Sequence, residues 1–220
     1  YTTLFRSFQV VSGTCDLDWK GSLLKQIELG ASKIFSFDQP TVKKKAHAGS
    51  LTQFQYMTDK EAEETITDNF NVALEQSKFL KENYPDEFKK FCYILQGKSL
   101  EQIRFNMELF NKTFGGIDHY LEYFPGGIVY GAKGGDNLYI AIAARHAYEH
   151  FIKRGIYVHF LGMGSFIRMI ILIRNEISTF DSSTLLQGVR VNEFTNPINL
   201  NNSLQLDSKN LGGFIKPFCN

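Results

Sequence analysis

The sequence predicts an α/β protein of the (β/α)8 TIM-barrel type that is truncated at both ends. Short segments typical of strands alternate with longer segments of helical periodicity along the chain, which indicates a parallel sheet with helical crossovers. No Gly-x-Gly-x-x-Gly motif follows the first strand, so a barrel is favoured over a dinucleotide-binding open sheet. The chain has 220 residues, whereas a complete barrel has about 250, so the predicted barrel is incomplete.

The elements follow in order from local patterns. We expect buried or alternating strands at 8–11, 33–37, 91–95, 119–124, 157–161 and 177–180. We expect helices, recognised from apolar residues at helical spacing, at 20–29, 58–83, 99–113, 138–154 and 165–174. The segments 41–57 and 131–137 are expected to be loops.

Capping residues mark where these helices begin and end. Gly30 follows the first helix, where a left-handed C-terminal residue is favoured. Thr58 with Glu61 and Ser99 with Gln102 have the spacing of capping boxes, which predicts helices beginning directly after Thr58 and Ser99.

Composition excludes several classes of protein. Lys and Arg number 24 against 23 Asp and Glu, so the net charge alone does not argue for a nucleic-acid partner. The three cysteines, Cys15, Cys92 and Cys219, are far apart and odd in number, which argues against a disulfide scaffold and for a reducing compartment. No apolar run reaches about 18 residues. We therefore expect a cytoplasmic protein without a membrane partner.

The start of the chain is expected not to belong to the fold. Residues 1–7 read like translated adapter DNA, so we expect them to be a cloning scar and exclude them. The remaining residues, 8–220, are expected to be the barrel fragment.

Polar or glycine residues close four of the predicted strands: Asp38, Gln96, the Gly126–Gly127 pair and Asp181. Because the carboxyl ends of barrel strands meet at one mouth, we expect these groups to converge. A carboxylate, an amide and a backbone N–H suit the hydrogen-bonding edge of guanine. The alternative for Asp181 is a turn or helix cap, the commonest role of an Asp at a strand end.

These segments together resemble the tRNA-guanine transglycosylase superfamily over nearly the whole chain. The matching segments are Phe8–Gln9, Leu29–Gly30–Ala31 with Phe37–Asp38, Leu95–Gln96–Gly97, Gly126–Gly127–Ile128, 160–164 and Phe180–Asp181. The resemblance implies a pentosyltransferase that replaces guanine in nucleic acid by a 7-deazaguanine. It implies that Asp181 attacks the sugar, that Asp38, Gln96, Gly126, Gly127 and Ile128 bind the base, and that Phe8 stacks on the base beside Gln9.

Two departures from the family pattern carry expectations of their own. The resemblance implies a general acid/base Asp in the register that Leu4 occupies here, and the loss of a general acid costs about 10²–10⁴-fold in rate. It also implies a zinc site in the full-length protein, with Cys219 as first ligand. Structural zinc takes four ligands, so we expect no metal in this fragment and nearly no base exchange.

Three questions stay open at the level of sequence. The segment 182–188 looks more like the divergent branch that inserts 7-deazaguanines into DNA, or like an archaeal-like relative, so tRNA and DNA are both candidate substrates. A fragment that binds base or nucleic acid without turnover is a further alternative, as is a barrel enzyme that holds a metabolite phosphate at 162–165. A homodimer is possible. His146 and His150, four apart on a helix, are expected to be structural.

Overall fold

The fold is described from a computed structural model. It describes residues 18–39, 41–45, 53–131, 137–163 and 165–181, without the side chains of 42–45, 53–56, 117 and 118. The chain divides into two compact units, 1–181 and 182–220, and every described residue belongs to the first. Several sequence predictions lie outside the described residues. They concern the segment 1–7, the predicted first strand, Phe8, Gln9 and Cys219.

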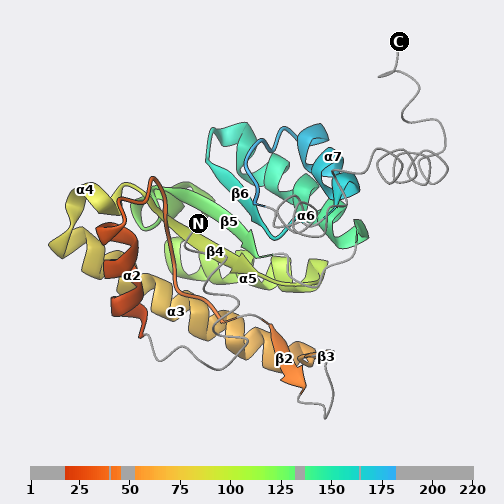
Figure 1. The fold of residues 1–220 in the computed structure, drawn as a ribbon, viewed down its shortest axis with the longest axis horizontal. Coiled ribbons are helices and arrows are strands. Elements are labelled where there is room, and N and C mark those ends of the chain that lie inside the picture. The colour runs from red at the N-terminus through yellow and green to blue at the C-terminus, as the bar shows by residue number, and fades with distance from the viewer. Residues whose placement is uncertain (1–17, 40, 46–52, 132–136, 164, 182–220) are drawn as a thin grey trace, which may run out of the picture. The chain divides into compact units, whose positions relative to one another are not determined.

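A parallel sheet forms the centre of the fold (Figure 1). Its order is β1 (Ile34–Phe35), β4 (Phe91–Gln96), β5 (Gly127–Gly131) and β6 (Val158–Leu161), and each neighbouring pair runs parallel. Beyond β6, Phe180 forms a parallel bridge with Phe160, so the described residues after position 174 continue the sheet. The prediction of a mixed α/β fold with a parallel sheet is confirmed, and the described residues form four strands of it.

Helices precede, connect or follow these strands. They are α2 (Trp19–Glu28), α3 (Asp59–Asn83), α4 (Pro85–Phe88), α5 (Leu100–Phe114), the 3-10 helix η1 (Ile117–Glu122), α6 (Asn137–His150), the 3-10 helix η2 (Ile152–Arg154) and α7 (Phe166–Arg174). The capping signals hold: Thr58 and Glu61 form a complete capping box, Ser99 accepts from the Gln102 N–H, and Gly30 has a left-handed φ of 63°.

The two faces of the sheet have different neighbours. Phe91, Tyr93 and Leu95 of β4 pack into a large aromatic core together with residues of α3, α5 and α6. The alternate residues Cys92 and Ile94 point to the opposite face, because successive side chains of a strand alternate. We call this second face, which also carries Phe35, Val129, Tyr157 and Leu161, the inner face.

Sequence predictions for several segments of the fold are wrong. Residues 119–124 do not form a strand, because most of this segment lies in η1. The strand is instead β5, which begins at Gly127, so the Pro125–Gly126–Gly127 turn precedes a strand and does not close one. Finally, the predicted loop 41–57 contains an antiparallel pair, β2 (Val42–Lys45) with β3 (Gln53–Tyr56).

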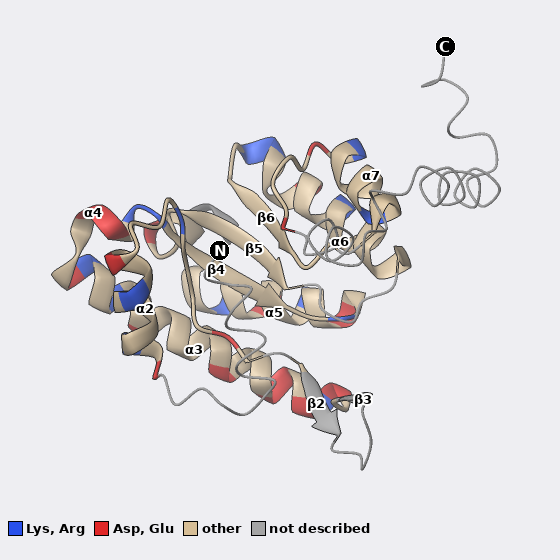
Figure 2. Ribbon diagram, viewed as in Figure 1, with Lys and Arg blue, Asp and Glu red and all other residues tan. Residues whose placement is uncertain are grey.

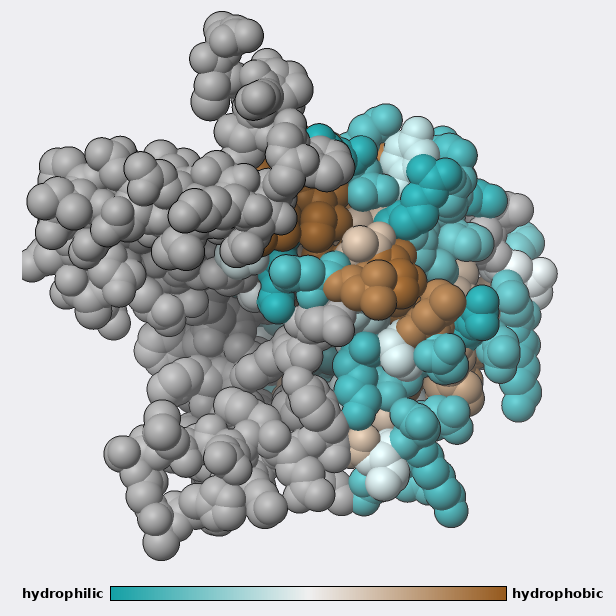
Figure 3. Space-filling view, turned by 90° about the vertical axis from the view of Figure 1, so that its right-hand side faces the viewer, coloured by the Kyte–Doolittle hydropathy of each residue, from teal (hydrophilic) through white to brown (hydrophobic). Residues whose placement is uncertain are grey.

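Charge is confined to the periphery of the sheet. No residue of β1, β4, β5 or β6 is Lys, Arg, Asp or Glu, and the charged residues in Figure 2 lie mainly on the helices and turns. One face of the molecule shows apolar residues gathered among hydrophilic ones (Figure 3). Among the described residues, no helix has the length and hydropathy that a membrane span requires.

Candidate functional site

The carboxyl ends of the parallel strands bring three of the predicted residues to one edge of the sheet. Gln96 is the last residue of β4, Asp38 follows β1, and Asp181 follows the bridge beside β6. The register places Gln96 level with Gly131, and Gly131 level with Leu161. Asp181 donates its N–H to the Phe160 carbonyl at 3.1 Å, which places it level with Leu161. A single inner-face row therefore runs from Gln96 to Asp181.

Asp38 and Gln96 are joined by a direct hydrogen bond in which the Gln96 side-chain amide donates to Asp38 Oδ2. Gln96 is buried, and Asp38 is half-buried. A carboxylate with further lone pairs and an amide with both a donor and an acceptor therefore stand together at the end of β1 and β4.

Two buried amides of α3 hold the segment that carries Asp38. Gln76 Oε1 accepts the Phe37 N–H at 2.9 Å. Asn69 accepts the Gln39 N–H at 2.8 Å and donates to the Gln39 carbonyl at 2.9 Å. The backbone on both sides of Asp38 is thus tied to α3, which fixes the position of this segment although β1 itself is only two residues long.

Gly131 is required by the close approach of Gln96. A Cβ atom built on Gly131 would lie 2.5 Å from Gln96 Nε2 and 2.6 Å from its Cδ. No side chain fits there while Gln96 keeps its position. The sequence predicts a loop from 131 to 137, which is wrong for Gly131, because this residue ends β5; the Ile-Val-Tyr run before it is a β signal.

The carboxylate of Asp181 is held at one oxygen. Oδ1 accepts the Gly162 N–H at 2.5 Å, and His159 Nε2 lies 4.0 Å from the same oxygen. The backbone is fixed as well, because the Asp181 carbonyl accepts the Met163 N–H at 2.9 Å. Burial lowers the pKa of His159, and the neighbouring Asp181 opposes this effect only in part.

Gly126, Gly127 and Ile128 do not join this edge, so the prediction that they line the site with the other residues is wrong. Gly127 is level with Cys92, four residues before Gln96 on β4, which is about 13 Å along the strand. Gly127 has a φ of 118° and packs against the Tyr157 backbone. Ile128 is buried in the aromatic core. The pair serves the close packing of strands at the amino end of the sheet.

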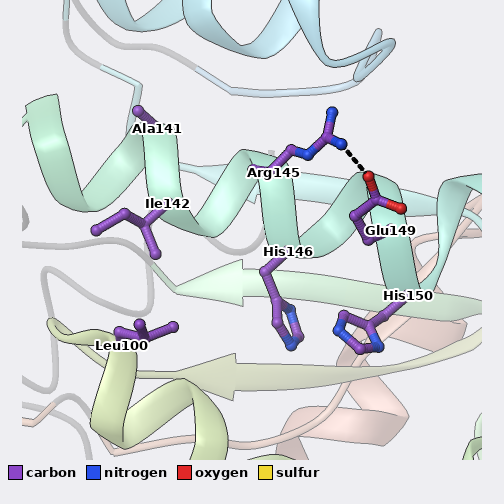
Figure 4. Close-up of a pocket in the computed structure, with 7 residues that line it drawn as sticks. All are labelled: Leu100, Ala141, Ile142, Arg145, His146, Glu149 and His150. Atoms are coloured by element: carbon purple, nitrogen blue, oxygen red, sulfur yellow. Dashed lines mark ion pairs between the residues drawn. The ribbon is translucent and has the colours of Figure 1, made fainter.

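A separate groove of about 430 Å³ lies on α6 (Figure 4). Its lining residues are Leu100, Ala141, Ile142, Arg145, His146, Glu149 and His150. In Figure 4 the His146 and His150 rings face each other on one side of α6, and the Arg145–Glu149 ion pair lies on the other.

The two histidines of this groove have structural partners. The Tyr130 hydroxyl lies 2.7 Å from His146 Nδ1, and the centroids of the two imidazole rings, which are tilted by 31°, lie 4.3 Å apart. Burial, followed by the neighbouring His150, lowers the pKa of His146 to about 4. No group of three or more His, Cys, Asp or Glu residues in the described part of the chain could hold a metal ion.

No protein-family model, curated protein or solved structure matches this chain.

Proposed function

We propose that this chain is the barrel part of a base-exchange transglycosylase that replaces guanine by a 7-deazaguanine in tRNA. The observation that supports this proposal is the arrangement of two groups at one sheet edge, the Asp38–Gln96 pair and the Asp181 carboxylate. The proposed fold is an incomplete (β/α)8 barrel to which the four parallel strands contribute.

The spacing of the two groups suits a purine nucleoside. Gln96 and Asp181 are separated by three strand intervals, which is about 14 Å between backbones at roughly 4.8 Å per interval. Side chains reaching inward from both ends shorten this distance. Gly131 and Leu161 lie between them in the row, and neither carries a polar side chain that would compete for the base.

The roles then follow from the chemistry of each group. Asp38 accepts from the N1–H and amino group of guanine, and Gln96 supplies a donor and an acceptor. Asp181 Oδ2 attacks C1′, the C1′–N9 bond breaks, and its electron pair leaves with guanine, which takes up a proton. The N9 of the incoming 7-deazaguanine then attacks C1′, loses its proton to solvent and releases the carboxylate. The target nucleotide has to leave its stack for this reaction.

The zinc site that the family resemblance implies is not part of this proposal. Its expected first ligand, Cys219, lies outside the described residues, and the described residues do not supply a ligand set. The steps above therefore use only Asp38, Gln96 and Asp181.

Covalent trapping tests the proposal directly. The chain is incubated with tRNA or with duplex DNA, together with a labelled 7-deazaguanine, and protein–nucleic acid adducts are separated on denaturing gels. We expect adduct with tRNA to form slowly, because Leu4 stands in the register of the general acid, and we expect Asp181→Asn to abolish it. Asp68→Asn, an exposed carboxylate change on α3, is the matched control and should leave the adduct unchanged.

The other outcomes identify the alternatives. An adduct with DNA alone would make DNA the substrate. Binding of guanine that Asp38→Asn weakens, without any adduct, would identify a base-binding fragment without turnover. An adduct that survives Asp181→Asn would show that another residue is the nucleophile.

A further inference from the structure

His159 is a polar side chain on the inner face, one row nearer the amino end of the sheet than Asp181, the proposed nucleophile. It is level with Val129 in the sheet and with Thr179 across the Phe160–Phe180 bridge, one inner-face row before Leu161 and Asp181. Its Nε2 lies 4.0 Å from Asp181 Oδ1, the oxygen that already accepts the Gly162 N–H. Neither the sequence motifs nor the proposed reaction gives this histidine a role.

The imidazole is held in place by aromatic neighbours. Its ring centroid lies 5.7 Å from that of Phe35 and 6.5 Å from that of Tyr157, with the Tyr157 ring nearly parallel. Only 15% of the side chain is exposed. The ring therefore has little freedom to turn, and Nε2 stays on the side of Asp181.

The other ring nitrogen indicates which tautomer is present. His159 Nδ1 is buried and has no hydrogen-bond partner among the described residues. A buried N–H without an acceptor is rarer and costlier than an unused lone pair. The neutral ring therefore carries its proton on Nε2, which faces the Asp181 carboxylate. Burial favours this neutral form because it lowers the pKa of His159.

We propose that His159 is a positioning residue for Asp181: its Nε2–H, 4.0 Å from Oδ1, attracts that oxygen electrostatically beside the hydrogen bond from the Gly162 N–H, and Oδ2 stays free to attack. A hydrogen bond and a nearby N–H dipole at one oxygen orient the carboxylate plane, and an oriented nucleophile reacts faster than a rotating one. This inference rests on the proposed function, which makes Asp181 the nucleophile, but the pairing of His159 with Asp181 can be measured without turnover.

Few titratable groups on the surrounding strands lie close enough to change the pKa of His159. Tyr157 stacks on the ring, Cys92 lies on the inner face of β4, and Asp181 faces Nε2. Lys33 reaches Tyr157 from the amino end, 4.3 Å above its ring. Of these groups, Asp181 alone is a carboxylate, so its removal should dominate any change at His159.

Nitrogen NMR of the chain with labelled histidine tests the pairing. We expect His159 in the neutral Nε2–H form at pH 7. Asp181→Asn should lower the pKa of His159 further, because the anion that favours the imidazolium is gone. A proton on Nδ1, or a titration of His159 that is the same in Asp181→Asn, would overturn the proposal.

Kinetics of adduct formation provide the second test. His159→Phe keeps the ring and removes the donor, and misplacement of the carboxylate should slow adduct formation about 100-fold without changing guanine affinity. His159→Gln restores an N–H donor and should recover part of the rate. His119→Gln, a change at an exposed histidine on η1, is the control and should have no effect.

The two tests separate this inference from the proposed function. If the wild-type chain forms no adduct, the proposed function fails while NMR still decides the pairing. If the wild type forms adduct and a folded His159→Phe forms it equally fast, the positioning role is wrong and the proposed function stands.

Discussion

Replacing Gly131 by alanine should disable base binding at a modest cost in stability. The new Cβ would lie 2.5 Å from Gln96 Nε2 and 2.7 Å from Oε1, well inside the 3.4 Å of ordinary contact. The atoms in the way are the end of a side chain, so Gln96 can move aside and release Asp38. Overpacking costs about 1–3 kcal/mol, and we expect about 1 kcal/mol here, since the clash can be relieved.

The same substitution at Gly126 is the matched control, at the amino end of the sheet. There the Cβ would lie 2.3 Å from the Lys90 carbonyl oxygen and 2.4 Å from its carbonyl carbon. These are backbone atoms next to β4 and cannot move without opening the β4–β5 pair. We expect Gly126→Ala to cost about 3 kcal/mol or more, at the upper end of overpacking.

Thermal unfolding and guanine titration distinguish the two variants. At about 2–4 °C per kcal/mol for a domain of this size, Gly131→Ala should lower Tm by a few degrees and Gly126→Ala by about 10 °C. Loss of a buried hydrogen-bonding group costs about 1–3 kcal/mol, so guanine affinity should fall roughly 10- to 100-fold in Gly131→Ala alone. Unchanged affinity in Gly131→Ala, or lost affinity in folded Gly126→Ala, would refute the reasoning about which glycine borders the site.

Three further predictions test the surroundings of the site. Unfolded His146 takes up a proton near pH 6.5, whereas the folded chain resists protonation until about pH 4. The free energy of unfolding should therefore fall by up to about 3 kcal/mol as the pH is lowered from 6.5 to 4, since each unit of pKa shift corresponds to about 1.36 kcal/mol. In His146→Gln, the free energy of unfolding measured with urea should change less over that pH range. Burial raises the pKa of Cys92 to about 12, so in a Cys15→Ser/Cys219→Ser background a thiol reagent should label it only at the rate of unfolding, and rapid labelling in native buffer would contradict its burial. Asn69→Leu leaves the Gln39 backbone without its two partners and should cost about 1–3 kcal/mol and weaken guanine binding, which calorimetry would show.

Local patterns predicted much of the fold because their causes are local. Helix α3 begins one residue after Thr58, as the capping box predicted, and ends directly before Tyr84 and Pro85. Strand β4 is buried along its whole length, as its continuous apolar run indicated. The places of Gln96 at the end of β4 and of Asp181 beside β6 follow from these boundaries.

The neighbours of a strand decided what the sequence by itself could not. Pro125–Gly126–Gly127 is typical of a turn, which can either follow a strand or precede one. Only the pairing of Gly127 with Cys92 shows that a strand begins there. The role of Gly131 depends on Gln96, which is remote in sequence, and that of His159 depends on Asp181. A capping box or an apolar period involves residues a few positions apart, whereas register and the burial of an unpaired nitrogen exist only once distant strands lie side by side.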